Sequence, residues 1–403
     1  MYGLDTAAAE ADEFRRAVAA RDAYRPLYVK IKLTFGCNLR CAMCGHWRTQ
    51  REAPLPIARL HALIDELADL GCRKLHLSGG EPLLRPQVPE LVEQASGRGV
   101  RVTLTTNGTL VDKALARRLA EAGLRGVNLS LDSPVRKIHD GVRGVAGAWK
   151  ATLRAARHLA RAAPRGKLAL RINTVVSRAN YRSLATLPDL AHELGAESLN
   201  LIGVDGHADR DLLLRPGDLA RYNALIAPQI AERALALGLI ADAAQAYPFG
   251  RSAEELALAS RGDYALGFYQ RHPCYAPWTH SLVDFNGLVY LCCMTRESAA
   301  ALGDLRQSTF AEVWHGESYA AARRMMHPPA LPQCRTCDNF IGYNRELGAL
   351  SNNDSAAGQP SPPAPLPHAG EGGISLPGEK CPPSPAAAGE GGGGGGQWCR
   401  APQ

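Results

Sequence analysis

The stretch that decides the fold is YVKIKLTFGCNLRCAMC, which runs from Tyr28 to Cys44. Residues 28–34 alternate apolar and polar side chains and predict a short strand. Three cysteines follow directly, at Cys37, Cys41 and Cys44, with the spacing C-x3-C-x2-C. Thiolates this close together on one loop can hold one face of a compact metal centre. The stretch therefore predicts a strand that leads into a metal-binding loop.

The identity of that centre has several interpretations. A [4Fe–4S] cluster normally takes four thiolates, so three would leave one iron open to a small molecule. A zinc site would need a distant fourth ligand. Three buried or metal-free cysteines are the remaining interpretation.

Strands and helices alternate along the chain after this loop. Strands are predicted over 28–34, 74–78, 100–105, 126–131, 168–176 and 198–204, and helices over 56–70, 87–96, 111–122, 146–162 and 181–194. This alternation indicates βαβ units and a parallel sheet, an α/β fold. Six such units are fewer than the eight of a closed barrel. An alanine-rich helix is predicted before them, and a helical connector over 216–239 after them.

A second motif, Leu77-Ser-Gly79-Gly80-Glu81-Pro82, follows the second predicted strand. Adjacent glycines let backbone groups approach a ligand closely, and a carboxylate beside them suits an ammonium group. An ordinary turn is the alternative. Together with the cysteine loop, this motif resembles the radical S-adenosylmethionine (radical SAM) superfamily, whose hallmark is a CxxxCxxC loop after the first strand of a partial (β/α)6 barrel.

The resemblance covers about residues 28–239 and implies a set of roles. Cys37, Cys41 and Cys44 would bind a [4Fe–4S] cluster whose open iron chelates SAM, and Glu81 would hold the SAM amino group. The segments TTNGT at 105–109 and SLDSP at 130–134 also resemble family motifs. The expected SAM contacts are Gly79, Gly80, Glu81, Pro82, Asn107, Ser130 and Asn173. Asp132 and Asn107 could instead be turn and cap residues. Arg143, in the stretch HDGVRG, is expected to order a loop.

A second group of cysteines lies at Cys274, Cys292, Cys334 and Cys337. An Asn286-Gly287 pair between apolar runs predicts a β-hairpin here. The C-x12-G-x4-C spacing resembles the start of a SPASM domain, which carries auxiliary clusters. Its later cysteines are missing, with Tyr343 at the first such position, so the resemblance implies a shortened, twitch-type domain with one [4Fe–4S] cluster. Cys293 competes with Cys292 as ligand, and zinc is the alternative metal.

The chain as a whole has 403 residues, 11 cysteines and a net charge of +7. The sequence has no run of about 18 apolar residues that could span a membrane, and it shows no secretory signal. We therefore expect a cytoplasmic protein with reduced thiols. We expect it to bind neither a membrane nor nucleic acid. The Gly/Pro-rich end predicts a disordered tail, which removes Cys381 and Cys399 as ligands. The expected divisions are an N-terminal helix at 1–26, the radical SAM core at 27–240, the auxiliary domain at 265–345 and the tail at 351–403.

The resemblance also implies a function. The enzyme would cleave SAM reductively to a 5′-deoxyadenosyl radical, which takes a hydrogen atom from the substrate, while the auxiliary cluster accepts the second electron. An external donor such as flavodoxin or ferredoxin would supply the first electron. We expect an oxidoreductase with a small-molecule substrate, slightly ahead of a maturase of ribosomally made peptides. A zinc-binding module without enzymatic activity is the third hypothesis.

Overall fold

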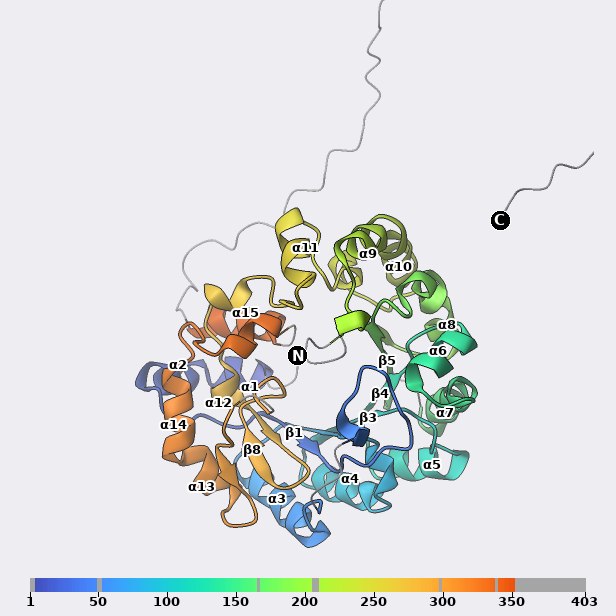
Figure 1. Cartoon of the computed structure of the whole chain (residues 1–403). Helices are drawn as coiled ribbons and strands as arrows, with labels where there is room; N and C mark the ends of the chain where they lie inside the picture. The colour runs from blue at the N-terminus through green and yellow to red at the C-terminus, as the bar shows by residue number, and fades with distance from the viewer. Residues whose placement is uncertain are drawn as a thin grey trace, which may run out of the picture. The chain divides into compact units, whose positions relative to one another are not determined.

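A computed structural model describes residues 4–48, 53–164, 167–204, 210–296, 299–337 and 340–351. The tail predicted over 351–403, which contains Cys381 and Cys399, falls outside the described residues. The exception is Ser351, which ends the last helix. The described chain forms one sheet with the strand order β6-β5-β4-β3-β2-β1-β7-β8-β9 (Figure 1). The first six strands are parallel and span Tyr28–Lys32, Lys74–Ser78, Arg101–Thr106, Gly126–Ser130, Ala169–Val176 and Ser198–Gly203.

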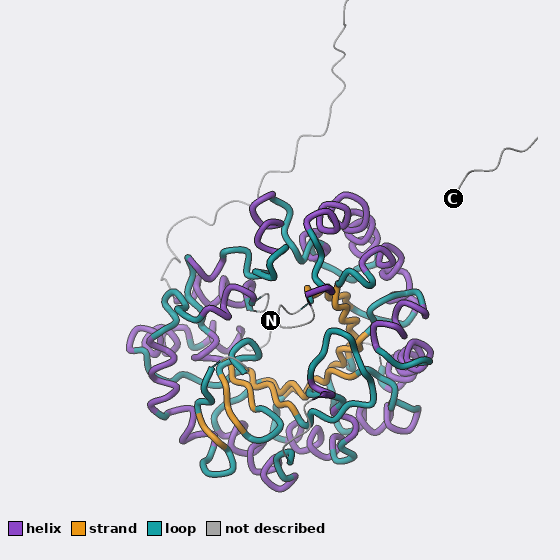
Figure 2. Tube along the Cα trace, in the orientation of Figure 1, coloured by secondary structure: helices purple, strands orange, loops and turns teal. Residues whose placement is uncertain are grey.

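The predicted strands are therefore confirmed, with ends that shift by one or two residues. Alternation along each strand gives the sheet two different faces. Val29 and Ile31 of β1 pack into the apolar core, so Tyr28, Lys30 and Lys32 point to the opposite, concave face. The sheet curves, with its concave face inward and helices around its outer face (Figure 2).

The helices of the outer layer match the predicted segments closely. Two local differences stand out. The N-terminal helix is split at Glu10, and the stretch before Gly144, expected to be a loop, is the short helix α6. The helices α1 to α15 span Leu4–Ala9, Ala11–Ala20, Ile57–Asp69, Val88–Gly97, Lys113–Glu121, Arg136–Arg143, Ala148–Ala162, Leu187–Glu193, Pro216–Arg221, Ala227–Ala236, Ala253–Ala259, Ala276–Thr279, Phe310–His315, Glu317–Arg324 and Ile341–Ser351.

The C-terminal cysteines belong to a region that extends the same sheet. Strand β7 (His280–Val283) pairs in parallel with β1, placing His280 opposite Tyr28. It then turns through Gly287, whose φ of 92° suits glycine, and pairs antiparallel with β8 (Leu288–Tyr290). Strand β9 (Gly303–Asp304) completes the edge. The predicted hairpin is confirmed, and the bounds of the separate domains stay predictions.

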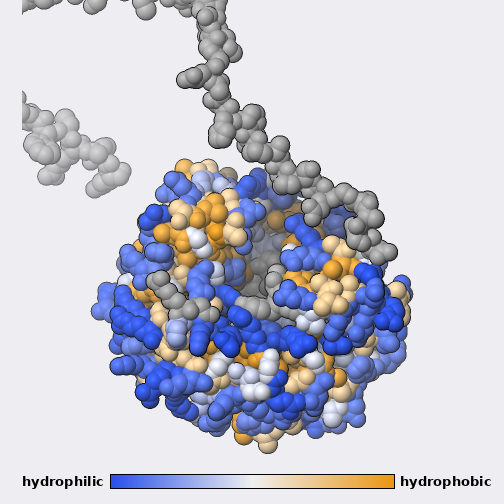
Figure 3. Space-filling view, turned by 180° about the vertical axis from the view of Figure 1, so that it is seen from behind, coloured by the Kyte–Doolittle hydropathy of each residue, from blue (hydrophilic) through white to orange (hydrophobic). Residues whose placement is uncertain are grey.

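The surface seen from behind is largely hydrophilic, with apolar residues in smaller patches (Figure 3). Within the described ranges, no helix is long and apolar enough to cross a bilayer. The apolar side chains gather instead in one large core between the sheet and the outer helices.

Candidate functional site

The three cysteines of the first loop lie together above the carboxyl end of β1. Cys41 is buried with Leu39 and Ala148, and Cys37 and Cys44 pack against the same small cluster. The end of α6 runs alongside this loop: the Arg40 amide donates to the Arg143 carbonyl at 3.0 Å. The loop is thus held from outside by backbone pairing.

Hydrogen-bond donors point at two of these sulfurs. The Leu39 amide lies 3.5 Å from Cys37 Sγ, and the Asn107 side-chain amide lies 3.9 Å from the same atom. The Arg143 guanidinium donates to Cys41 Sγ at 3.7 Å. Burial raises the pKa of the Cys41 thiol, while the Arg143 charge opposes that shift. Donors and a cation of this kind stabilise thiolate, the form that binds metal.

Arg143 is part of a buried unit at the end of β4. Its Nε lies 2.7 Å from Asp132 Oδ2, and the Asp132 carboxyl also accepts from the Val175 amide at 3.0 Å. His139 Nδ1 accepts from the Asp132 amide at 3.2 Å. The segments SLDSP and HDGVRG therefore meet in space and steady the cysteine loop. Sequence reasoning expected the role of Arg143 but not its ion pair with Asp132.

The two glycines of the second motif let it lie against the cysteine loop. A Cβ on Gly80 would stand 2.2 Å from the Gly36 carbonyl oxygen, and one on Gly79 would stand 2.3 Å from that of Thr34. The Gly80 amide donates to the Thr34 oxygen at 2.7 Å. The close approach that glycine permits here is therefore between two loops of the protein.

Glu81 is fully buried and holds three hydrogen bonds. Its carboxylate accepts from Thr106 Oγ1 at 2.7 Å, the Asn107 amide at 2.8 Å and the Leu83 amide at 3.0 Å. Burial raises the pKa of this carboxyl, and the hydrogen bonds oppose the rise. Glu81 thereby joins its own loop to the end of β3, where Asn107 reaches Cys37.

The remaining expected SAM contacts fall into two places. Pro82 is buried at the start of a 3-10 turn, Pro82–Leu84, beside Glu81. Ser130 and Asn173 face each other in register on β4 and β5, on the concave face. Asn200 of β6 continues this polar row, and its side-chain amide lies 3.5 Å from Asn173 Oδ1. The structure thus joins Asn107 and Glu81 to the cysteine loop and keeps Ser130 and Asn173 farther along the sheet.

The second group of cysteines also converges. Cys337 is buried with Phe268 and Tyr269, and Cys274 and Cys334 pack against the same cluster. Burial raises the pKa of Cys274 to about 12 and that of Cys334 to about 11. Among the described residues, no three His, Cys, Asp or Glu side chains could hold one metal ion.

Cys292 and Cys293 lie in different surroundings. Cys292 is close enough to Cys274 for their charges to interact, and both charges act on Tyr269. The charge of Cys293 acts on its neighbour Cys292, and it also reaches Tyr28 and Lys32 on the concave face of β1. This difference favours Cys292 as the member of the C-terminal group. Cys72 is buried at the start of β2, apart from both groups, with its thiol 3.3 Å from the Lys74 carbonyl.

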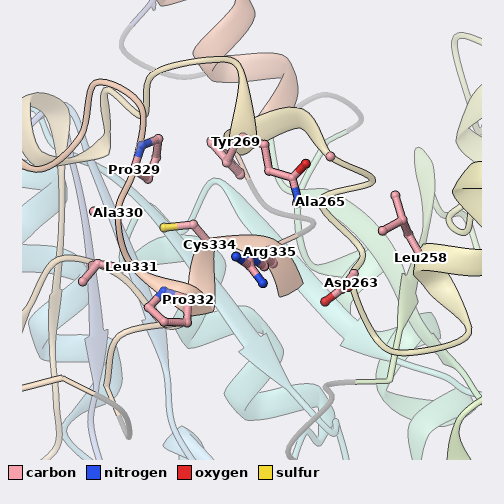
Figure 4. Close-up of a pocket in the computed structure, with 12 residues that line it drawn as sticks. Leu258, Asp263, Ala265, Tyr269, Pro329, Ala330, Leu331, Pro332, Cys334 and Arg335 are labelled. Atoms are coloured by element: carbon pink, nitrogen blue, oxygen red, sulfur yellow. The ribbon is translucent and has the colours of Figure 1, made fainter.

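Two polar residues among the C-terminal thiols were not found by sequence reasoning. Asn344 donates to Tyr269 Oη at 2.9 Å and to Cys274 Sγ at 3.8 Å, and accepts from the Tyr275 amide at 2.6 Å. Tyr269 and Cys334 also line a cavity of about 120 Å³ (Figure 4). No spacing pattern connects these residues with the cysteines, because the fold brings them together from separate segments.

Comparison with known proteins agrees with this arrangement. Residues 31–177 match the radical SAM superfamily, and residues 274–338 match the SPASM iron–sulfur cluster-binding domain. The PqqA peptide cyclase of Granulibacter bethesdensis is 25% identical over 89% of this chain and 92% of its own length. The AdoMet-dependent heme synthase of Methanosarcina barkeri is 34% identical over 49% of this chain, a match that spans 56% of the relative.

Solved structures share the fold. Streptococcus suis SuiB bound to S-adenosylmethionine superposes with a TM-score of 0.59 at 18% identity, covering 80% of this chain and 74% of SuiB. The superfamily implies SAM and a [4Fe–4S] cluster, and the second domain implies further iron–sulfur. The chain therefore belongs to the radical SAM superfamily and carries a C-terminal SPASM domain.

Proposed function

We propose that this radical SAM enzyme is an oxidoreductase that modifies a peptide. The observation that carries the proposal is the extent of similarity to the PqqA peptide cyclase, which covers 89% of this chain and 92% of the relative. The heme synthase matches about half of this chain. That second relative favours the small-molecule substrate of the sequence analysis, which we keep as the second candidate.

The side chains present suit the two cofactors. Cys37, Cys41 and Cys44 would ligate the first cluster, because they share one apolar cluster and two of their sulfurs, those of Cys37 and Cys41, receive hydrogen-bond donors. When bound, this cluster would supply the electron for the reductive cleavage of SAM, and the chemistry so provided would be hydrogen-atom abstraction from the substrate. The chain itself positions the loop through Arg143 and the Asp132 carboxylate.

The positions of the expected SAM contacts are compatible with one ligand that touches all of them. Glu81 and Asn107 sit at the cysteine loop, while Ser130 and Asn173 lie on the concave face farther along. A ligand that meets both places would lie across the carboxyl ends of the strands, where parallel α/β folds bind their ligands. The loop beneath that ligand would be shaped by Gly79, Gly80 and Pro82.

Cys274, Cys292, Cys334 and Cys337 would ligate a single auxiliary cluster with no open position, a composition that suits transfer of the second electron. Asn344 would donate to the Cys274 sulfur and tune the cluster. An external donor such as flavodoxin or ferredoxin would deliver the first electron. These proposals assume a cytoplasmic, reducing environment.

The test is an anaerobic reaction of the reconstituted protein with SAM and dithionite. We expect 5′-deoxyadenosine, and about eight iron atoms for two four-iron clusters. A Cys37→Ala/Cys41→Ala/Cys44→Ala variant should lose the product and keep the auxiliary iron. Zinc without iron in the wild-type protein would overturn the proposal in favour of the zinc module.

Substrate class needs a separate assay. A Cys274→Ala variant should still cleave SAM and should fail to complete the oxidation of the substrate. A mass change of two hydrogens in a co-expressed precursor peptide would support the peptide assignment. The same change in a small molecule, with every co-expressed peptide unaltered, would favour the second candidate.

A further inference from the structure

Helices α5 and α7 pack against each other in the outer layer (Figure 1), and a groove of about 520 Å³ lies between them. Its described lining consists of two alanines and four side chains that can carry a positive charge: Lys113, Ala114, Arg117, His158, Arg161 and Ala162. None of these lining residues is acidic. A cleft lined by charges of one sign attracts a partner of the opposite sign, here an anion.

Helix α7 extends this positive charge along one of its sides. Lys150, Arg154, Arg157 and Arg161 follow one another at intervals of four, three and four residues, so they form a basic stripe along one side of the helix. All four are exposed, and the helix contains neither Asp nor Glu. Within the described part of the chain, none of the four forms an ion pair. The stripe therefore keeps its full charge.

The two carboxylates of the neighbouring helix α5 already have partners. Asp112 precedes the helix as its N-cap, and its Oδ1 accepts from the Leu115 amide at 2.7 Å. Glu121 lies at the end of the helix, with its Oε1 3.5 Å from Arg117 Nε. Arg117 is thus partly compensated, whereas the cations of α7 are not. The groove and the stripe together hold a positive charge that their own two helices leave in surplus.

The basic stripe begins beside the first cysteine loop. Ala148, in the first turn of α7, is buried together with Cys41. One turn later, Thr152 Oγ1 donates to the carbonyl oxygen of Asn107, the residue whose side-chain amide reaches the first cysteine. Lys150 lies between these two contacts in the sequence. From there the stripe runs for about 16 Å along the helix, at the usual rise per residue.

The extent of this surface distinguishes between its possible occupants. A small anion would need only the groove, which is lined at its α7 side by His158, Arg161 and Ala162. The stripe continues beyond the groove to Lys150, next to the cysteine loop. An acidic surface of a partner protein can contact the groove and the far end of the stripe at once, so the observations favour a protein.

We propose that this surface docks an acidic protein that carries single electrons. The α5–α7 face consists of Lys113, Arg117, Lys150, Arg154, Arg157, His158 and Arg161. The need for a carrier rests on the function proposed above, in which an external donor supplies the first electron. In the docked complex one electron passes from the reduced carrier to the first cluster, and no covalent bond forms or breaks. Complementary charge speeds the encounter and orients one edge of the carrier beside the cysteine loop.

The experiment measures both binding and electron delivery with the reconstituted holoenzyme. The probe is a flavodoxin with an acidic surface, reduced by NADPH and a flavodoxin reductase. Biolayer interferometry gives the Kd of the flavodoxin, and formation of 5′-deoxyadenosine gives its KM as electron donor. We expect binding that weakens as the salt concentration rises, because exposed charges are screened.

Two variants remove charge from the two helices separately. Arg154→Gln/Arg161→Gln on α7 and Lys113→Gln/Arg117→Gln on α5 should each raise the Kd and the KM of the flavodoxin about five-fold. Arg154→Lys/Arg161→Lys keeps both charges and should stay within about two-fold of wild type. An unchanged Kd in either glutamine variant would overturn the inference.

A matched control removes two exposed charges from other parts of the surface. Arg221 ends α9, and Arg271 lies three residues before Cys274. Both are exposed, and neither forms an ion pair with any residue that the structure describes. Arg221→Gln/Arg271→Gln should leave the Kd of the flavodoxin within about two-fold of wild type. A loss as large as that of the α7 variant would indicate a general effect of net charge and would contradict a defined docking face.

Dithionite separates failure of this inference from failure of the proposed function. It is a small reductant that needs no docking face, so every variant should form 5′-deoxyadenosine with dithionite as wild type does and should retain the same iron content. Absence of product from the wild-type protein with dithionite would count against the proposed function. Normal product with dithionite, without any binding of the flavodoxin, would count against the docking face alone.

A short double-stranded RNA in the same binding assay tests the other large anion that a basic face could hold. We expect the flavodoxin to bind more tightly than the RNA. Tighter binding of the RNA that is lost in both glutamine variants, with the KM of the flavodoxin unchanged, would assign the face to nucleic acid and overturn the inference.

Discussion

At the scale of single residues, Arg143 connects strand and loop. It pairs with the carboxylate of Asp132 and donates to the sulfur of Cys41. Arg143 and Asp132 are both almost fully excluded from solvent. The ion pair raises the pKa of Arg143, so this side chain stays charged. Removal of either partner leaves a buried charge alone, which is far more costly than the loss of a surface pair.

We predict that Arg143→Gln lowers the free energy of unfolding by about 3–5 kcal/mol. Anaerobic urea denaturation measures it. Asp132→Asn should have an effect of similar size, and the double variant should lose less than the sum of the two, with a coupling of about 0.5–3 kcal/mol. Strictly additive losses would contradict the pairing.

The Gly80→Ala substitution is expected to push the GGEP loop away from the cysteine loop. The new Cβ would meet the Gly36 carbonyl oxygen at 2.2 Å, and backbone on both sides would have to move. We expect loss of 5′-deoxyadenosine formation and of the iron bound by the first loop. Gly97→Ala is the matched control, since a Cβ there has no neighbour within 4 Å, and it should retain both. Normal activity of Gly80→Ala would show that the loops can separate without harm.

Lys32 gives the protein a dependence of stability on pH. Its pKa in the folded state is about 7, lowered mainly by burial, and its unfolded value is near 10.5. Between these values the unfolded chain binds the extra proton, so this lysine makes the protein less stable as pH falls from about 10 to 7, by up to about 1.4 kcal/mol per unit. Lys32→Met should remove that dependence. Parallel stability curves of variant and wild type over pH 7–10 would contradict it.

At the scale of elements, the junction of β1 and β7 decides where the auxiliary region stands. The Asn286-Gly287 turn signalled the hairpin, but nothing in the spacing of residues indicated that β7 would pair in parallel with β1. Parallel pairing between strands about 250 residues apart depends on the remainder of the barrel being in place. The segment that carries the second cysteine group is thereby fixed beside β1, the strand that leads into the first cysteine group.

Leu282→Pro tests this junction. Leu282 lies inside β7, fully buried between β1 and β8, and proline cannot donate to a ladder in a central strand. We expect a loss of about four iron atoms, those of the auxiliary cluster, while SAM cleavage persists at a reduced rate. Iron analysis and electron paramagnetic resonance of the reduced protein measure it. Full auxiliary iron would show that the pairing is dispensable.

At the scale of the whole molecule, the N-terminal helices join the first and last parts of the described chain. Trp314 Nε1 donates to the Tyr24 carbonyl at 2.8 Å, and Trp278 Nε1 to that of Ala17 at 3.3 Å. Phe14 contacts the ring of Tyr275 with centroids 5.8 Å apart. Since Tyr275 follows Cys274, the N-terminal helices support the auxiliary site from behind.

Phe14→Ala should therefore destabilise the protein and weaken the auxiliary site. Phe14 is fully buried, and truncation of such a side chain costs about 3–5 kcal/mol. We expect reduced auxiliary iron together with earlier thermal unfolding, and a much smaller effect for Phe14→Leu, which keeps most of the volume. Unchanged iron in Phe14→Ala would indicate that the helices stabilise the fold without supporting the site.

The sequence by itself determined the parallel sheet, its six strands, the two cysteine groups and the superfamily resemblance. These features are local: strand alternation, glycine pairs and cysteine spacing are properties of short segments. Tertiary structure decided the rest. It favoured Cys292 over Cys293, brought Asn344 and Tyr269 to the thiols and paired Asp132 with Arg143. Each of these depends on which distant segments meet, and only the packing of the whole chain fixes that.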